Sequence, residues 1–214
     1  MFSRFKPRQP GPATPTSGEI RLPSPQYDGK ISVQQALLKR RSVREYRDQP
    51  LSLEEVSQLL WAAQGVTDAG GHRTAPSAGA LYPLEVYLLV GDVQQLPAGV
   101  YRYLPHGHSL VLIADGDQRR NLARAALGQE SIQEAPAVIL ISAVVARTAA
   151  KYGDRAERYV YMEVGCAAQN VYLQAEALGL GTVMIGAFYD EEVKRLLAMP
   201  RQEQPMCIMP VGVK

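Results

Sequence analysis

The chain has 214 residues, a formal net charge of +2 and 46% hydrophobic residues. This length is most simply one domain with a single core, and so small a charge excludes nucleic acid or an anionic membrane as the main partner. The two cysteines, Cys166 and Cys207, have no second cysteine or histidine at metal-ligand spacing, so we expect no metal site and a reducing compartment. No apolar run is long enough to span a bilayer, and the basic N-terminus lacks the apolar region of a signal peptide, which favours a cytoplasmic protein.

The first thirty residues differ in composition from the rest. Residues 1–30 contain six prolines among glycine, serine and threonine. Such a segment buries little apolar surface, so it predicts a mobile arm that could wrap a neighbouring subunit. The expected folded domain is residues 31–214, and it opens with a short amphipathic helix that begins at Val33.

A basic cluster follows this helix. Lys39, Arg40, Arg41 and Arg44 surround Ser42. Arginine offers planar, charge-assisted donors, so the cluster could hold a phosphate group. The alternative is a solvated basic turn at a helix C-terminus, where cations also suit the helix dipole.

The next segments alternate between clear elements and loops. Ser52 and Glu55 have the spacing of a capping box for a helix over residues 53–63. A loop of small residues between Pro76 and Pro83 would let a flat ligand approach the backbone and the Ser77 hydroxyl, although many loops that enter strands look similar. Strands are expected over residues 85–90, 100–103 and 110–114, a helix over 117–127, and a doubly buried strand over 137–145.

The longest predicted helix covers residues 159–178. Its apolar residues recur every three or four positions, and its opposite face is hardly more polar, so it should lie in a core or in a subunit interface. Gly179 is suited to end it. Strands over residues 182–186 and 207–213 complete the pattern. The irregular mixture of strands and helices, without a GxGxxG motif, predicts an α+β fold and not a dinucleotide-binding one.

Four segments in order resemble a known family. They are RRSVR at residues 40–44, PSAGA at 76–80, the stretch from GLGT to Gly186 at 179–186, and PVG at 210–212. In this order they are similar to the nitroreductase superfamily of FMN-dependent oxidoreductases, over nearly all of residues 33–214. The wider segments RTAPSAGALYPLEVYL, KYGDRAERY and EVGCAAQNVYLQAEALGLG resemble its SagB-type dehydrogenase branch.

This resemblance implies a fold, a cofactor and a site. The fold would be a mixed, mainly antiparallel sheet flanked by helices, with the long buried helix at the interface of a homodimer that holds two FMN molecules. The phosphate and the pyrimidine edge of FMN would be held by Arg40, Arg41, Ser42 and Arg44. The loop that the partner subunit lays along the flavin ring would be Pro76, Ser77, Ala78, Gly79 and Ala80. Backbone groups near flavin N5 would come from Met184, Ile185 and Gly186. Family members supply another basic residue to the phosphate after the last strand, and Lys214 is the candidate here.

Two substrate classes are open within this family. NAD(P)H could reduce FMN, which then reduces a nitroaromatic or a quinone. Alternatively, FMN could oxidise an azoline in a peptide to the aromatic azole, which needs a base to remove a proton. Lys151 and Tyr152 match the Lys-Tyr pair of azoline dehydrogenases, and an adjacent ammonium favours the ionised form of a tyrosine. These two residues could instead belong to a surface loop that leads into the long helix. A flavin-binding protein without catalysis, or a subunit of a larger synthetase, is the third hypothesis.

Overall fold

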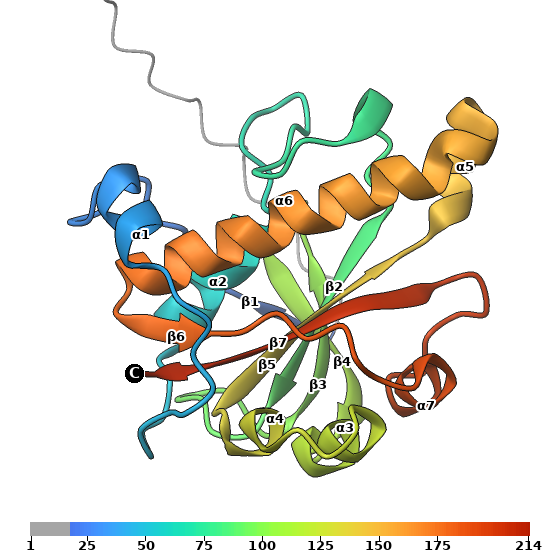
Figure 1. Cartoon of the computed structure of the whole chain (residues 1–214). Coiled ribbons are helices and arrows are strands. Elements are labelled where there is room, and N and C mark those ends of the chain that lie inside the picture. The colour runs from blue at the N-terminus through green and yellow to red at the C-terminus, as the bar shows by residue number, and fades with distance from the viewer. Residues whose placement is uncertain (1–17) are drawn as a thin grey trace, which may run out of the picture.

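The computed structural model describes residues 18–214, which form a seven-stranded sheet with helices on both faces (Figure 1). The strands are β1 Glu19–Arg21, β2 Leu84–Val90, β3 Gly99–Leu104, β4 Ser109–Asp115, β5 Ala137–Ala143, β6 Leu180–Thr182 and β7 Gln204–Val213. The helices are α1 Val33–Lys39, α2 Leu53–Gln64, α3 Arg119–Ala125, α4 Glu130–Glu134, α5 Val145–Tyr152, α6 Ala156–Ala177 and α7 Asp190–Leu196. Among these described residues, no helix is both long and apolar enough to cross a membrane.

The sheet has the strand order β1-β4-β3-β2-β5-β7-β6, and every neighbouring pair is antiparallel. Its centre is the long pairing of β2 with β5, from Leu84 opposite Ala143 to Val90 opposite Ala137. Helices α2 and α6 lie on one face of this sheet, and α3, α4 and α7 lie toward the other (Figure 1). The predicted α+β class is therefore confirmed.

The central strands are buried on both faces because each face packs against a different layer. In β2, Leu88 joins the core shared with α2 and α6, whereas its neighbour Leu89 joins the core shared with α3, α4 and α7. In β5, Ile139 and Leu140 divide in the same way. Side chains alternate across a strand, so only a strand with two covered faces can be apolar at every position. This arrangement accounts for the continuous apolar run that predicted a doubly buried strand.

Two predicted strands are shorter in the structure. The strand expected over residues 137–145 ends at Ala143, and Val145 begins α5, so Lys151 and Tyr152 lie at the end of a helix and not in a loop. The strand expected over residues 182–186 is Leu180–Thr182 in the structure, so it lies earlier in the chain and shares only Thr182 with the prediction. The Met184 N–H donates to the Tyr172 hydroxyl at 2.7 Å, which takes this residue out of any sheet ladder.

Helix α6 has one buried and one exposed face in a single chain. Val160 and Val171 have no exposed surface and Ala175 is 1% exposed, as their spacing predicted, whereas Tyr161 and Met162 are about 60% exposed. After the helix, Gly179 has a φ of +77°, the left-handed conformation expected for a glycine that ends a helix.

Part of the expected proline-rich arm packs on the domain. Residues 1–17 lie outside the described residues, but Glu19–Arg21 form β1 and pair with β4. Leu22 is buried, and the Pro23 carbonyl accepts a hydrogen bond of 2.6 Å from Ser57. Composition did not indicate this edge strand, because three residues are too few to show an alternating pattern.

Candidate active site

The basic segment after α1 lies along the edge of the sheet. The Val43 N–H donates to the Thr182 carbonyl at 2.9 Å, and Ser42 forms a bridge with the same residue of β6. A Cβ on Gly181 would lie 2.7 Å from the Val43 side chain, and one on Gly212 would lie 2.7 Å from the Tyr46 ring. The glycines of the GLGT and PVG motifs are therefore needed for this segment to lie flat against β6 and β7.

Tyr172 of α6 connects two of the predicted site segments. Its hydroxyl accepts the hydrogen bond from the Met184 N–H and lies 3.2 Å from the Ser42 hydroxyl. The Arg40 guanidinium lies over its ring, 5.2 Å from the centroid. No sequence pattern marked Tyr172 as a site residue, since α6 also carries Tyr159 and Tyr161.

The cations of this cluster have different environments. Arg41 donates to the Leu38 and Arg40 carbonyls, so its guanidinium completes the end of α1. Arg40 and Arg44 form no ion pair with any residue between 18 and 214. Lys214, the candidate for a further phosphate contact, pairs with Glu176 at 2.6 Å. Arg40 and Arg44 are thus the predicted site cations that could meet an anion, and Lys39 likewise forms no ion pair within this range.

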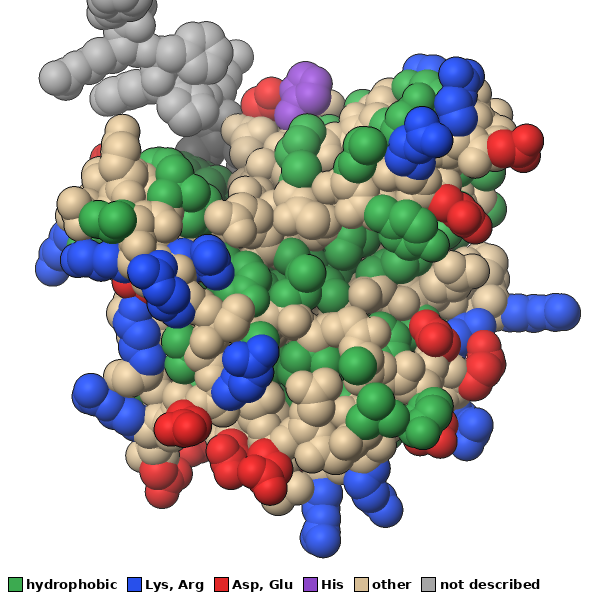
Figure 2. Space-filling view, viewed as in Figure 1, with side chains coloured by type: hydrophobic (Ala, Val, Ile, Leu, Met, Phe, Trp, Pro, Cys, Tyr) green, Lys and Arg blue, Asp and Glu red, His purple; other side chains and the backbone are tan. Residues whose placement is uncertain are grey.

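Two of the three predicted residues that follow β6, Met184, Ile185 and Gly186, are accessible. Met184 is 48% exposed, and Gly186 is also exposed. The side chain of Ile185 is buried, and both of its backbone groups bond to Ile208. Figure 2 shows an apolar band below α6 in the space-filling view, with Lys and Arg side chains gathered at its left end.

The predicted flavin-facing loop, residues 76–80, belongs to a longer loop at the other end of α6. This longer loop, residues 73–82, is held to α6 by Asn170, whose amide donates to the Thr74 carbonyl at 3.2 Å. Ser77 accepts the Tyr82 N–H at 2.9 Å. Between them, Ala78–Ala80 form one turn of 3-10 helix, in which Gly79 has a φ of +64°. Pro76, Gly79 and Ala80 are exposed.

Lys151 and Tyr152 meet this loop at Gly79. A Cβ on Gly79 would lie 2.9 Å from the Tyr152 hydroxyl and 3.0 Å from the Lys151 ammonium nitrogen. The same ammonium lies 5.5 Å from the centroid of the Tyr152 ring, and Tyr159 packs edge-on against that ring at 5.0 Å. The structure thus brings together the Lys-Tyr pair and the loop, which lie far apart in the sequence.

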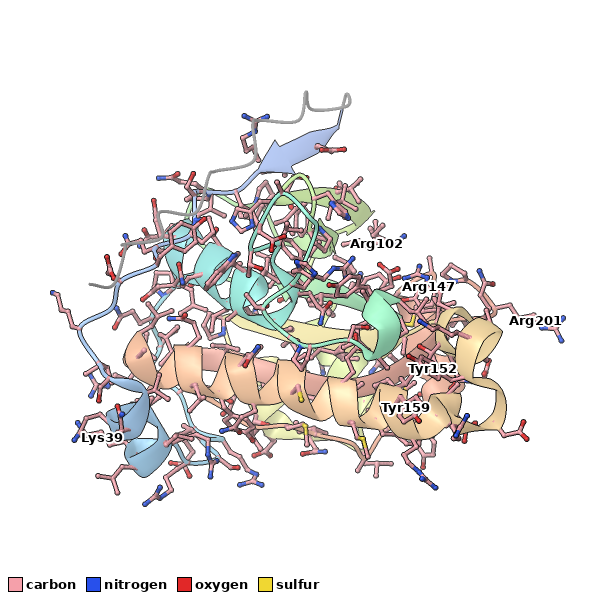
Figure 3. All side chains as sticks on the ribbon, turned by 90° about the horizontal axis from the view of Figure 1, so that it is seen from above. Lys39, Arg102, Arg147, Tyr152, Tyr159 and Arg201 are labelled. Carbon is pink, nitrogen blue, oxygen red and sulfur yellow. The ribbon has the colours of Figure 1, made fainter. Side chains whose placement is uncertain are left out.

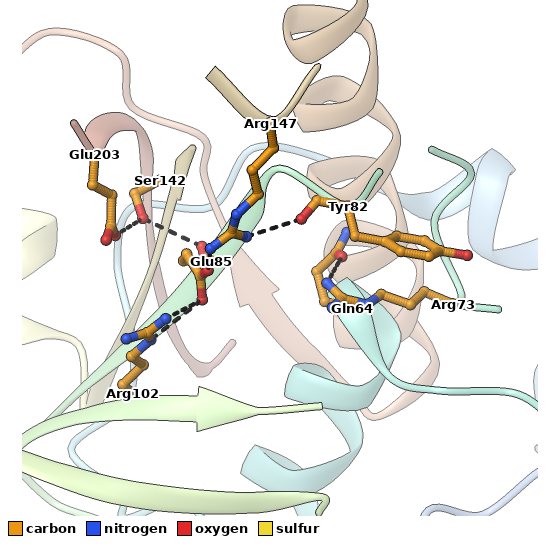
Figure 4. A network of polar contacts seen from close by, with 8 residues as sticks. All are labelled: Gln64, Arg73, Tyr82, Glu85, Arg102, Ser142, Arg147 and Glu203. Atoms are coloured by element: carbon orange, nitrogen blue, oxygen red, sulfur yellow. Dashed lines mark hydrogen bonds and ion pairs between the residues drawn. The ribbon is translucent and has the colours of Figure 1, made fainter. Parts of the chain in front are cut away.

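Arg147 holds α5, and with it the Lys-Tyr pair, in place. Its guanidinium donates to the Glu85 carboxylate at 2.5 Å and to the Tyr82 carbonyl at 3.1 Å (Figure 4). Glu85 also pairs with Arg102 of β3 at 2.8 Å. These contacts join the helix, the end of the loop and the central sheet, and no sequence pattern indicated them.

The two groups of predicted residues lie at opposite ends of α6. Figure 3 shows Lys39, next to the basic segment, at one end of this helix, and Tyr152 and Tyr159 at the other. A helix of 22 residues is about 33 Å long at 1.5 Å per residue. One chain alone therefore does not unite Arg40 and Met184 with Gly79 and Tyr152.

Two of the three histidines have structural partners. His108 lies 2.8 Å from both the Ser57 and Tyr103 hydroxyls, and burial lowers its pKa. His72 pairs with Asp68 at 2.7 Å on the surface. Within residues 18–214, no group of three His, Cys, Asp or Glu side chains could hold a metal ion. A cavity of about 870 Å³ lies between α2, α6 and residues 24–33, and none of the predicted site residues lines it.

Comparison with known proteins identifies the family. Residues 37–213 match the model of the nitroreductase family, so the chain belongs to this family of oxidoreductases. It is 53% identical over 196 residues to "Putative nitroreductase MJ1384" of Methanocaldococcus jannaschii, covering 92% of this chain and 96% of that protein. It is also 31% identical over 159 residues to the "Microcin B17-processing protein McbC" of Escherichia coli, covering 71% of this chain and 58% of McbC.

Solved structures agree with this assignment. The crystal structure of a "putative nitroreductase" from Ralstonia eutropha has a TM-score of 0.81 at 32% identity, covering 97% of this chain and 95% of that one. A chain of the E. coli microcin synthetase McbBCD complex, with truncated pro-MccB17 bound, has a TM-score of 0.70 at 25% identity, covering 89% of this chain and 76% of that one. The recognition of this family from four short motifs is therefore confirmed.

Proposed function

We propose that this protein is an FMN-dependent oxidoreductase that works as a homodimer. The observation that carries the proposal is the junction at Tyr172, where Ser42 and Met184 meet beside Arg40. Arg44 follows two residues after Ser42, and neither arginine forms an ion pair within residues 18–214. Thr182, next to Ser42, also has a buried hydroxyl without a hydrogen-bond partner among the described residues. Free guanidinium groups, hydroxyls and an exposed backbone are the donor set that a flavin phosphate and ring require.

The residues that would hold FMN follow from this junction. Arg40, Ser42 and Arg44 would bind the phosphate and the pyrimidine edge, and Met184 and Gly186 would lie beside the ring. Arg41 and Lys214 would contribute less directly, because their charged groups already have partners. Bound FMN would supply the two-electron chemistry, accepting or donating a hydride at N5 in two half-reactions.

A second copy of the chain would complete the site. The exposed face of α6 carries Tyr161, Met162, Gly165 and Cys166, and a Cβ on Gly165 would meet nothing within 4 Å. A two-fold axis across this face would bring the Gly79 end of one α6 to the Tyr172 end of its partner. Residues 76–80, with Lys151 and Tyr152, would then face the flavin that the other subunit holds.

The geometry best supports the oxidation of an azoline in a peptide. Conversion of an azoline to an azole removes one hydride and one proton from the ring. Tyr152 would take the proton, and the Lys151 ammonium beside the same glycine would stabilise negative charge on the tyrosine oxygen. The similarity to McbC, described as a microcin-processing protein, supports this substrate class.

A second candidate reaction is the NAD(P)H-dependent reduction of nitroaromatics or quinones. The archaeal relative described as a nitroreductase favours it, since that relative matches nearly the whole chain. This reaction needs no base on the protein to activate a carbon-bound proton. Tyr152 would therefore be dispensable for it.

Anaerobic single-turnover experiments separate these candidates. The protein loaded with FMN is mixed with a synthetic thiazoline peptide or with NADH, and bleaching of the flavin absorption is followed. We expect bleaching by the peptide, its loss in Tyr152→Phe, and its retention in the control Tyr159→Phe, which keeps the neighbouring ring. Bleaching by NADH alone, unaffected by Tyr152→Phe, would support the second candidate. A bound flavin that neither reagent bleaches would favour a non-catalytic subunit.

A further inference from the structure

A buried carboxyl group lies under the loop that carries Gly79. Glu163 belongs to α6 and is 4% exposed, although a carboxylate is stable in such a place only with partners. Its Oε1 atom has no hydrogen-bond partner among the described residues. The proposed chemistry does not use this group, and no sequence motif singled it out.

The partners that Glu163 does have come from the 73–82 loop. The Ser77 hydroxyl, the Arg73 guanidinium and the Ala78 N–H all lower the pKa of its carboxyl group. Burial acts in the opposite direction and is the largest cause, so the pKa is raised from 4.5 to about 6. The loop therefore covers an acid that would be better solvated if the loop moved away.

The outer side of the same loop contacts the Lys-Tyr pair. Ser77 and Ala78 face Glu163, and the next residue, Gly79, touches the ends of Lys151 and Tyr152. If the loop moved away from Glu163, the surface that contacts the Lys151 and Tyr152 side chains would therefore move as well. We propose that Glu163 is a positioning residue that sets how firmly the 73–82 loop is seated between α6 and the Lys-Tyr pair.

The sign of the effect follows from proton linkage. A carboxyl group whose pKa is higher in the closed loop than in water binds its proton more tightly when the loop is closed. Protonated Glu163 therefore favours the closed loop, and ionisation favours its opening. A pKa rise from 4.5 to about 6 corresponds to a change in the opening equilibrium of up to about 30-fold between acid and neutral pH.

Other charged groups near the loop already have partners. Arg73 donates to Gln64 at 2.8 Å and lies over the Tyr82 ring, 4.5 Å from its centroid (Figure 4). Glu85 of β2 and Arg147 of α5, which also act on Arg73, are paired with each other. His72, next to Arg73 in sequence, pairs with Asp68 and is the one neighbour among these that needs its own control variant.

Hydrogen exchange of the loop amides tests the proposal without any substrate. Protection of residues 73–82 is measured at pH 5 and pH 8 and corrected for intrinsic exchange rates. In the wild type we expect protection to fall by about eightfold between pH 5 and pH 8, because a solvated carboxyl group is already largely ionised at pH 5. Glu163→Gln, which cannot ionise, should keep its protection at both pH values, and His72→Gln should behave like the wild type.

Two results would overturn the proposal. One is equal protection of the wild-type loop at both pH values, and the other is an unchanged pH dependence in Glu163→Gln. If that variant fails to fold, Ser77→Ala replaces it; it removes a group that lowers the pKa, so the midpoint of loosening should move to higher pH. The catalytic role of the 73–82 loop rests on the proposed function, but the pH-dependent opening of this loop does not. Loss of flavin binding with an intact pH effect would refute only the proposed function.

Discussion

Replacing Gly79 by alanine tests whether the contact of this residue with the Lys-Tyr pair matters for catalysis, apart from the cost of its backbone conformation. The new Cβ would lie 2.9 Å from the Tyr152 hydroxyl and 3.0 Å from the Lys151 nitrogen, too close for either to stay in place. Both atoms end long side chains that can swing away. The collision would therefore displace the proposed base while adding little to the free energy of folding.

The backbone cost of this substitution can be matched elsewhere. Gly79 has a φ of +64°, and an alanine in this left-handed conformation costs about 1–2 kcal/mol. Gly128 has a φ of +76° and nothing within 4 Å of its Cβ position, so Gly128→Ala carries the same cost without the contact. In a chain of this size, both variants should lose about 2–8 °C in Tm.

The rate of azoline oxidation should distinguish the two variants. Displacing a catalytic group by about 1 Å can cost on the order of 100-fold in rate, so Gly79→Ala should be at least tenfold slower than the wild type. Gly128→Ala should oxidise the peptide at the wild-type rate below its Tm. Equal rates in the two variants would refute the inference that Gly79 sets the position of Tyr152 and Lys151.

Three further predictions follow from other contacts. Tyr172→Phe removes the acceptor of the Met184 N–H and the partner of Ser42. At about 1 kcal/mol for each of these two hydrogen bonds, the Kd for FMN measured by fluorescence quenching should rise by up to about 30-fold. In urea unfolding of the FMN-free protein, a rise from pH 4.5 to pH 7 should lower the free energy of unfolding of the wild type by about 2 kcal/mol relative to that of Glu163→Gln, because a raised pKa gives stability that is lost as pH rises. The same difference in unfolding free energy between wild type and variant at both pH values would contradict this. Finally, Arg44→Glu and Tyr152→Phe should each abolish azoline oxidation, yet mixed dimers of the two should recover about a quarter of the wild-type activity, because half of the dimers hold one intact site. No recovery would place both residues in a site within one chain.

Local patterns predicted much of the fold. The capping box at Ser52 and Glu55 is present, with the Ser52 N–H donating to the Glu55 carboxylate at 2.8 Å. The spacing of small and apolar residues gave the buried face of α6, and the continuous apolar run gave β5. These signals are local, since they depend on neighbours within one turn or one strand.

The rest depends on contacts between distant segments. Helix α5 follows a strand directly, without a side-chain cap, so nothing in its sequence marks where the strand stops. The break after β6 arises because the Met184 N–H bonds to Tyr172, a residue of the preceding helix. Two further features likewise exist only in the folded chain: the contact of Lys151 and Tyr152 with Gly79, and the buried position of Glu163. The motifs named the candidate site residues, and the family resemblance implied that the 76–80 loop serves the partner's flavin, but no motif showed that Lys151 and Tyr152 contact this loop.

Flavin retention tests the central claim most directly. The purified protein is incubated with excess FMN, passed through gel filtration, and its visible absorption is compared with its protein content. We predict that about one FMN per chain stays with a dimer, and that Arg40→Ser and Arg44→Ser each weaken this retention while leaving the dimer intact. A chain that elutes free of flavin would contradict the account of the site. So would flavin retention that neither Arg40→Ser nor Arg44→Ser changes.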